Sequence, residues 1–208
     1  MIESFHVKIF PQEQLRLFEI LSEQEWMNPF YLAGGTALAL QIGHRRSVDF
    51  DFFTIHDFNV RQITKTLSEL GRFELFNEEN NTINGALDGV KISFFKYVYP
   101  VIMPLKKHHC INLADTFDIA LMKLEAISGR GHKRDFFDLY FLFKKYPLTD
   151  MLNNYEKKYG LAVTNHYHLL KALTYFDDAE KEEMPVMFEE ADWNKIKKTI
   201  LKAEQKLI

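Results

Sequence analysis

The sequence predicts an α+β protein, in which an α/β half of about 112 residues precedes a mostly α-helical half. Short apolar runs with the alternation typical of strands are confined to the first half. Asn80-Asn81 and Asp88-Gly89 separate such runs, and the second pair is a strong hairpin signal. After Pro104 the apolar residues recur at helical spacing. We therefore expect two domains, over residues 1–112 and 113–208.

The first half is expected to alternate helices with strands before a β-rich stretch. Apolar residues one helical turn apart predict the first helix, and Gly43 and Gly71 are expected to end the two helices that follow. The expected elements are a helix over about 12–26, a strand over Phe30–Ala33, a helix over Thr36–Ile42, a strand over Val48–Phe53, a helix over Phe58–Leu70, and strands over 73–76, Thr82–Leu87 and Val90–Tyr97.

The second half is expected to be helical to its end. Asp115 is a suitable N-cap for its first helix, and Gly129 ends that helix. A second helix is expected over Arg134–Lys145, because Pro147 cannot continue it. Further helices are expected over about 149–158, 165–175 and 191–206.

The composition excludes several classes of protein. Of the 208 residues, 47% are hydrophobic, which is enough for a packed core and argues against a disordered chain. The net charge of −3 means that any nucleic-acid-binding surface must be local. A single cysteine, Cys110, rules out an intrachain disulfide and a zinc site built from cysteines. The N-terminus lacks the apolar core of a signal peptide, so we expect a cytoplasmic protein without a membrane partner.

Asp49 and Asp51 lie in the strand expected over Val48–Phe53. Residues i and i+2 of a strand point to the same face, so both carboxylates project one way. Two carboxylates about 7 Å apart at their Cα atoms can share a divalent cation, and Mg²⁺ favours such a pair together with waters and substrate phosphates. The ordinary alternative is a pair of exposed aspartates on an edge strand.

Gly34-Gly35-Thr36 lies between an expected strand and an expected helix. Glycines at the end of a strand allow a ligand to approach the backbone closely. The free N–H groups at the start of the helix and the hydroxyl of Thr36 can then bind phosphate oxygens. The alternative is a tight turn in which Thr36 serves as an ordinary N-cap.

Together these two elements resemble the signature of the nucleotidyltransferase superfamily of the polymerase-β type: Gly34-Gly35, thirteen further residues, then Asp49-Phe50-Asp51-Phe52. The longer string GGTALALQIGHRRSVDFDFF is similar to the AbiEii/AbiGii toxin family, which are nucleotidyltransferases of bacterial toxin–antitoxin and phage-defence operons. The similarity continues in MKLEAISGRGHKRDFFDLYFL, over Met122–Leu142, and covers roughly residues 29–145.

The resemblance implies a nucleotidyltransferase-type mixed sheet flanked by helices, with the helical half completing the active-site cleft. It implies that Asp49 and Asp51 bind Mg²⁺ and that, with Lys123 and Asp138, they form the catalytic set. The nucleotide-binding residues that we expect are Gly34, Gly35, Thr36, Arg46, Lys123 and Arg134.

Ordinary structural explanations compete for several of these residues. Lys123 is otherwise a solvated helix lysine, and Arg134 with Asp138 is otherwise an i,i+4 ion pair. Asp138 itself could act as a base for the acceptor hydroxyl, or orient Lys123 or Arg134. The basic loop His44–Arg46 contacts a triphosphate or an RNA acceptor, or is simply solvated.

One departure from the superfamily concerns a third carboxylate, which is commonly found on a later strand and often activates the acceptor hydroxyl. The corresponding place here is Val90–Tyr97, whose sequence VKISFFKY contains no acidic residue. Either Asp138 takes over this function, or the acceptor needs little activation, or the protein is catalytically weak.

The expected function is Mg²⁺-dependent transfer of a nucleoside monophosphate from an NTP to a hydroxyl, with release of pyrophosphate. The resemblance implies an RNA acceptor such as the tRNA 3′ end, and a cognate antitoxin protein as a partner. The alternatives are a non-catalytic module on the same fold that binds a nucleotide or a partner, and nucleotidylation of a protein or a small molecule.

Overall fold

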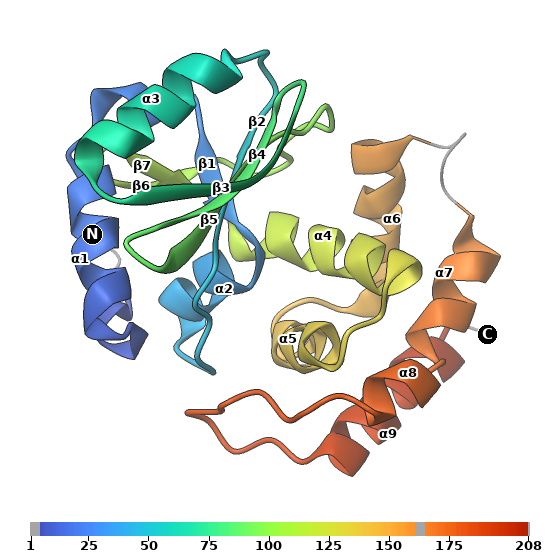
Figure 1. The fold of residues 1–208 in the computed structure, drawn as a ribbon. Helices are drawn as coiled ribbons and strands as arrows, with labels where there is room; N and C mark the ends of the chain where they lie inside the picture. The colour runs from blue at the N-terminus through green and yellow to red at the C-terminus, as the bar shows by residue number, and fades with distance from the viewer. Residues whose placement is uncertain (1–4, 161–164, 208) are drawn as a thin grey trace. The chain divides into compact units, whose positions relative to one another are not determined.

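The computed structural model describes residues 5–160 and 165–207, which form two compact units (Figure 1). The first unit ends at Asp115 and the second begins at Thr116, except that Val101–Met103 belong to the second unit. Among the described residues, no helix combines the length and the apolar content that crossing a bilayer requires.

The first unit is built on one mixed sheet. Within the described residues the sheet has seven strands, in the order β3-β4-β5-β2-β1-β7-β6. Strands β2 and β5 pair in parallel, as do β1 and β7, and the other neighbours are antiparallel. The strands are β1 (Tyr31–Ala33), β2 (Phe50–Thr54), β3 (Phe73–Glu79), β4 (Thr82–Leu87), β5 (Val90–Lys96), β6 (Lys106–His108) and β7 (Ile111–Leu113). The expected α+β class with a mixed sheet is thus confirmed.

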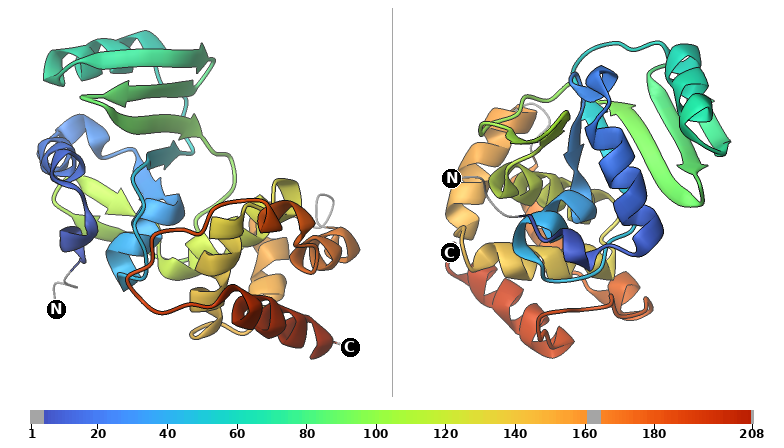
Figure 2. Two further views of the ribbon diagram at one scale, coloured as in Figure 1. Left: turned by 60° about the horizontal axis from the view of Figure 1, so that its bottom comes forward. Right: turned by 90° about the vertical axis from the view of Figure 1, so that its left-hand side faces the viewer.

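Three helices accompany this sheet: α1 (Gln12–Ser22), α2 (Gly34–Ile42) and α3 (Val60–Leu70). Helix α3 packs on β3 and β4, where Figure 2 shows it running alongside the strands. The core lies on the face of β2 that carries Phe50 and Phe52, both of which are fully buried. Phe18 of α1 stacks on Phe50 at 6.0 Å between ring centroids, and Phe52 stacks on Phe94 of β5 at 5.2 Å.

The observed elements differ from the expected ones in several of their bounds, and some of them were not expected. Helix α2 begins at Gly34 and β2 begins at Phe50, so Asp49 immediately precedes its strand. Strands β6 and β7 were not expected, because three-residue strands carry too little alternation to stand out from a loop. They form a hairpin whose turn holds His109 at φ +50°.

The second unit is helical, as expected. Its longest helix is α4, and α5, α6 and α7 all pack against it. Helix α9 packs on α5, where Trp193 stacks on Phe137 at 5.8 Å between ring centroids. The helices are α4 (Thr116–Gly129), α5 (Lys133–Phe143), α6 (Leu148–Tyr159), α7 (His166–Leu173), the short α8 (Asp177–Glu180) and α9 (Trp193–Gln205).

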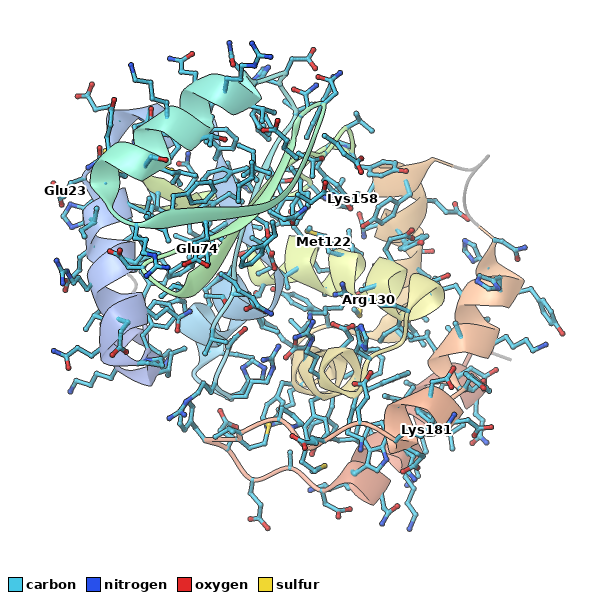
Figure 3. The ribbon with its side chains drawn as sticks, viewed as in Figure 1. Glu23, Glu74, Met122, Arg130, Lys158 and Lys181 are labelled. Carbon is cyan, nitrogen blue, oxygen red and sulfur yellow. The ribbon has the colours of Figure 1, made fainter. Side chains whose placement is uncertain are left out.

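A buried ion pair holds part of this unit together. Asp118 of α4 and Lys158 of α6 are joined at 2.8 Å, and each side chain is only 1% exposed (Figure 3 labels Lys158). The same carboxylate accepts hydrogen bonds from the backbone N–H groups of Ile102 and Met103, at 2.9 and 2.8 Å. Asp118 therefore joins the segment 101–103 to two helices.

Replacing Lys158 by methionine is expected to destabilise the protein by about 3–5 kcal/mol, because it leaves the Asp118 carboxylate buried without its cation. The measurement is the free energy of unfolding in urea. The control is Lys157→Met, since Lys157 is exposed and, within the part of the chain that the structure describes, its ammonium group bonds only to Asn154 of the same helix. Equal stability of the two variants would contradict this account of the ion pair.

Candidate functional site

In the first unit, the turn from β1 into α2 brings the backbone of Gly34 against the side chain of Asp51. Ala33, the last residue of β1, is paired with Asp51 of β2 in the antiparallel ladder. Gly34 has φ +71°, and a Cβ atom there would lie 3.2 Å from Asp51 Oδ2. Position 34 thus favours glycine for its backbone conformation, and a side chain there would crowd this carboxylate.

Gly35 lies beneath the basic loop. A Cβ atom at this position would clash with the guanidinium of Arg45 and lie 3.0 Å from Ser47 Oγ. Arg45 is only 4% exposed, and its Nη1 donates to the carbonyl of Arg46 at 2.9 Å. The side chain of Arg46, which was expected to bind nucleotide, is exposed, so Arg45 is the arginine of this loop that lies over the start of α2.

Thr36 is buried at 1% exposure, and its hydroxyl is already engaged. Its Oγ1 is hydrogen-bonded to Ser47 Oγ at 2.9 Å and donates to the backbone carbonyl of Asp49. These bonds hold the segment 47–49 against the first turn of α2. The structure thus places Thr36 where it positions the backbone of Asp49.

Asp49 and Asp51 are half-buried, while Phe50 between them is fully buried. This alternation puts the two aspartates on the opposite side from the core. In the parallel ladder, the residue of β5 that pairs with Asp51 is Ser93, which lies on the strand where the resemblance led us to look for a third carboxylate. Among the described residues, no group of three or more histidine, cysteine, aspartate or glutamate side chains is arranged to hold a metal ion.

Aromatic side chains continue the face that carries Asp51. Phe53 follows it by two residues, and Phe53 is paired with Tyr31 of β1 and with Phe95 of β5. The ring of Phe53 lies 5.9 Å from that of Tyr31, 5.4 Å from that of Phe95 and 5.4 Å from that of Tyr97. The Asp51 carboxylate is therefore flanked on its own face by an aromatic cluster.

In the second unit, Lys123 of α4 meets two aspartates of α5. Its Nζ lies 2.6 Å from Asp135 Oδ1 and 2.6 Å from Asp138 Oδ2. Lys123 is 4% exposed and both aspartates are fully buried, which excludes the alternative of a solvated helix lysine. We call these three residues the buried triad.

Asp135 was not among the expected site residues, although it lies one helical turn before Asp138. Its second oxygen, Oδ2, accepts from Nε of Arg130 at 3.3 Å, so it joins the buried triad to the loop after α4. Arg134, which was expected to bind nucleotide, is exposed on α5.

The carboxyl of Asp135 makes stability depend on pH. Burial alone would raise its pKa, but the charge and hydrogen bond of Lys123, with the charge of Arg130, hold this pKa below the ordinary value of 3.8. The ionised Asp135 carboxylate therefore stabilises the fold fully at pH values above its ordinary pKa. This stabilisation is lost as the pH falls through the lower pKa that Asp135 has in the folded protein. We expect the stability difference between wild type and Asp135→Asn, measured by urea unfolding, to shrink below about pH 4. A difference that stays constant with pH would contradict this.

The turn at Gly34 can be tested against a glycine with a similar conformation. Gly89, in the turn between β4 and β5, has φ +83°, but a Cβ atom there would meet nothing within 4 Å. Gly34→Ala and Gly89→Ala are each expected to lower stability by about 1–2 kcal/mol. Only Gly34→Ala is expected to weaken metal-dependent NTP binding, measured by calorimetry, because only there does the methyl group crowd a site carboxylate. Equal NTP binding by the two variants would be the contrary result.

Comparison with known proteins identifies one sequence relative and several solved structures with a similar fold. An uncharacterized protein of Aquifex aeolicus (strain VF5) is 38% identical over 177 residues, a match that covers 82% of this chain and 85% of that one. Two solved structures share the fold: JHP933 from Helicobacter pylori, with a TM-score of 0.55 and 18% identity, and MenT4, a nucleotidyltransferase toxin of Mycobacterium tuberculosis H37Rv, with 0.54 and 12%. They cover 95% and 94% of this chain, over 93% and 85% of their own lengths.

The family model that matches describes the nucleotidyl transferase AbiEii toxin of type IV toxin–antitoxin systems, and it matches residues 16–109 and 109–206. These two ranges include the Gly34–Asp51 region and the buried triad. The chain therefore belongs to the AbiEii toxin family, and the protein is a nucleotidyltransferase.

Proposed function

We propose that this nucleotidyltransferase uses Mg²⁺ to transfer a nucleoside monophosphate from an NTP to a hydroxyl of RNA, such as the tRNA 3′ end. The observation that carries the proposal is the closeness of Asp51 to Gly34 at the first turn of α2, where a Cβ atom on Gly34 would lie 3.2 Å from Asp51 Oδ2. The proposed metal ligand and the proposed phosphate-binding start of α2 would therefore lie side by side. A cognate antitoxin, as the family's type IV toxin–antitoxin systems imply, is the expected protein partner.

Asp49 and Asp51 fit the requirements of Mg²⁺. They offer oxygen ligands from two half-buried side chains on one short segment, and Mg²⁺ typically takes one or two carboxylates and completes its shell with waters and substrate phosphates. When bound, the ion would neutralise charge on the phosphates and orient them. Magnesium requires no third protein carboxylate, so Ser93 beside Asp51 is compatible with such a site.

The triphosphate would lie over the start of α2. The first N–H groups of a helix have no partners within the helix, and together with the helix dipole they favour an anion. Arg45, whose guanidinium lies over Gly35, adds a planar cation suited to phosphate oxygens. Thr36 would act as a positioning residue, because its hydroxyl holds Ser47 and the carbonyl of Asp49.

For the buried triad we propose that Asp135 and Asp138 position Lys123, whose charge would offset that of the triphosphate and the departing pyrophosphate. Both carboxylates lie 2.6 Å from the ammonium group, which fixes its location. This arrangement favours the role of Asp138 in orienting Lys123 over the role of a base.

The test is incubation of the purified protein with Mg²⁺, total RNA and each α-labelled NTP in turn, with the products resolved by size. Transfer of label to an RNA of defined size supports the proposal. Transfer of label to a protein or to a small molecule would show that the acceptor is that molecule and not RNA. Mg²⁺-dependent NTP binding without any labelled product would instead favour a nucleotide-binding module. This outcome would fit the presence of Ser93, and not a third carboxylate, beside Asp51.

A further inference from the structure

A cavity of about 340 Å³ lies in the second unit, outside the groups assigned above to the NTP. It is formed by the last turn of α4, the loop that follows, α7 and the start of α8. Figure 3 labels Arg130, which belongs to its lining, at this end of α4. Its volume is in the range of small-molecule sites in proteins, which is about 300–1,000 Å³.

The rim of the cavity is positively charged. Arg130 and Lys171 both line it, and Lys171 is exposed without an ion-pair partner in residues 5–160 and 165–207. The one acidic residue of the lining, Asp178, is paired with Lys181 at 3.2 Å, and Arg130 is paired with Asp135 at 3.3 Å, so the excess positive charge of the lining is that of Lys171. This balance of charges favours an anionic ligand.

The remaining surface of the cavity suits a flat aromatic group. Tyr175 lines it with a side chain that is 52% exposed, and buried Ile127 provides an apolar floor. A Cβ atom at Gly129, the last residue of α4, would meet nothing within 4 Å, so open space lies beside this end of the helix. His168 closes one side through a hydrogen bond of 3.2 Å between its Nε2 and the Ser128 carbonyl.

We propose that this cavity binds one nucleotide of single-stranded RNA, with its phosphate on Arg130 and Lys171 and its base against Tyr175. Cationic side chains beside an aromatic ring are the usual means of holding single strands without strong sequence preference. Arg130 also bonds Asp135, so the cavity adjoins the buried triad within the same unit. The inference rests on the proposed RNA acceptor and assigns it a binding site in the helical unit.

The experiment measures the anisotropy of a short fluorescein-labelled single-stranded RNA titrated with the full chain in EDTA, which prevents metal-dependent NTP binding. Tyr175→Ala is expected to weaken binding about fivefold or more. Lys171→Glu is expected to weaken binding and to reduce the slope of log K against log salt by about 0.7. Tyr175→Phe, which keeps the ring, and Lys198→Glu, on the exposed part of α9 outside the cavity lining, are expected to bind like wild type.

Competition with unlabelled AMP separates the two sources of such a ligand. Displacement of the labelled RNA by AMP would show that a free mononucleotide is enough to occupy the cavity. Failure of AMP to displace the RNA would show that the cavity requires a nucleotide within an RNA strand. The proposal is overturned if wild type does not bind the RNA, if Lys171→Glu and Tyr175→Ala bind it like wild type, or if Lys198→Glu weakens binding equally. Asp49→Asn with Asp51→Asn is expected to bind this RNA normally in EDTA, so failure at the cavity can be told apart from failure of nucleotidyl transfer.

Discussion

Replacing Asp49 and Asp51 together by asparagine is expected to lower nucleotidyl transfer at least about a hundredfold. Asparagine keeps the shape of the side chain but removes the negative charge that a divalent cation needs. Both positions are half-buried and lie outside the apolar core, so the fold is expected to survive. The measurement is the rate of label transfer from an α-labelled NTP to RNA at saturating Mg²⁺.

The matched control for this double variant is Glu78→Gln, which neutralises an exposed carboxylate on β3 of the same unit. Its transfer rate is expected to equal that of wild type. If the double variant retains wild-type activity while its circular dichroism spectrum is unchanged, the metal is not held by these two residues.

The second large effect is expected at Lys123. Lys123→Met removes the cation from between two fully buried aspartates, while Asp135 retains its bond to Arg130. The expected loss of stability is about 3–5 kcal/mol, because two buried carboxylates lose the cation that they share. Transfer activity is expected to fall further than this loss explains, because the triphosphate also loses a positive charge. Urea unfolding and the rate per folded molecule, at a temperature where the variant is folded, measure the two effects.

Lys158→Met separates these two effects, since Lys158 also pairs with a buried aspartate of the second unit but has no place in the proposed chemistry. The two variants are expected to lose similar stability, while only Lys123→Met loses activity per folded molecule. If Lys123→Met and Lys158→Met have equal activity per folded molecule, the buried triad contributes to stability and not to nucleotidyl transfer.

Much of the fold could be predicted because it depends on local patterns. The alternation along Val90–Tyr97 and the Asp88-Gly89 turn specify the hairpin of β4 and β5, and glycines mark the helix ends. The hairpin of β6 and β7 could not be predicted in this way, because its strands are short and β7 is held by pairing with β1, which is remote in sequence. The ion pair of Asp118 and Lys158 likewise joins residues 40 apart, and no local pattern predicts it.

In the candidate site, too, features set by local sequence patterns could be predicted, and features set by contacts between remote segments could not. The sequence placed Gly34 and Asp51 in one motif, and the antiparallel pairing of β1 with β2 explains why they meet. It did not show that Thr36 and Arg45 are buried, because that depends on how the loop 43–49 folds back over α2. Lys123 lies off the apolar stripe of its helix, so its burial follows from the partners that α5 supplies and not from spacing.

The most direct test of the account is calorimetric titration of the protein with an NTP, with and without Mg²⁺. The Gly34 turn and the two aspartates are expected to give binding that requires Mg²⁺ and that disappears in Asp49→Asn with Asp51→Asn. Binding of the NTP with equal affinity by this variant, or by wild type in EDTA, would contradict the claim that these residues hold a metal-bound triphosphate.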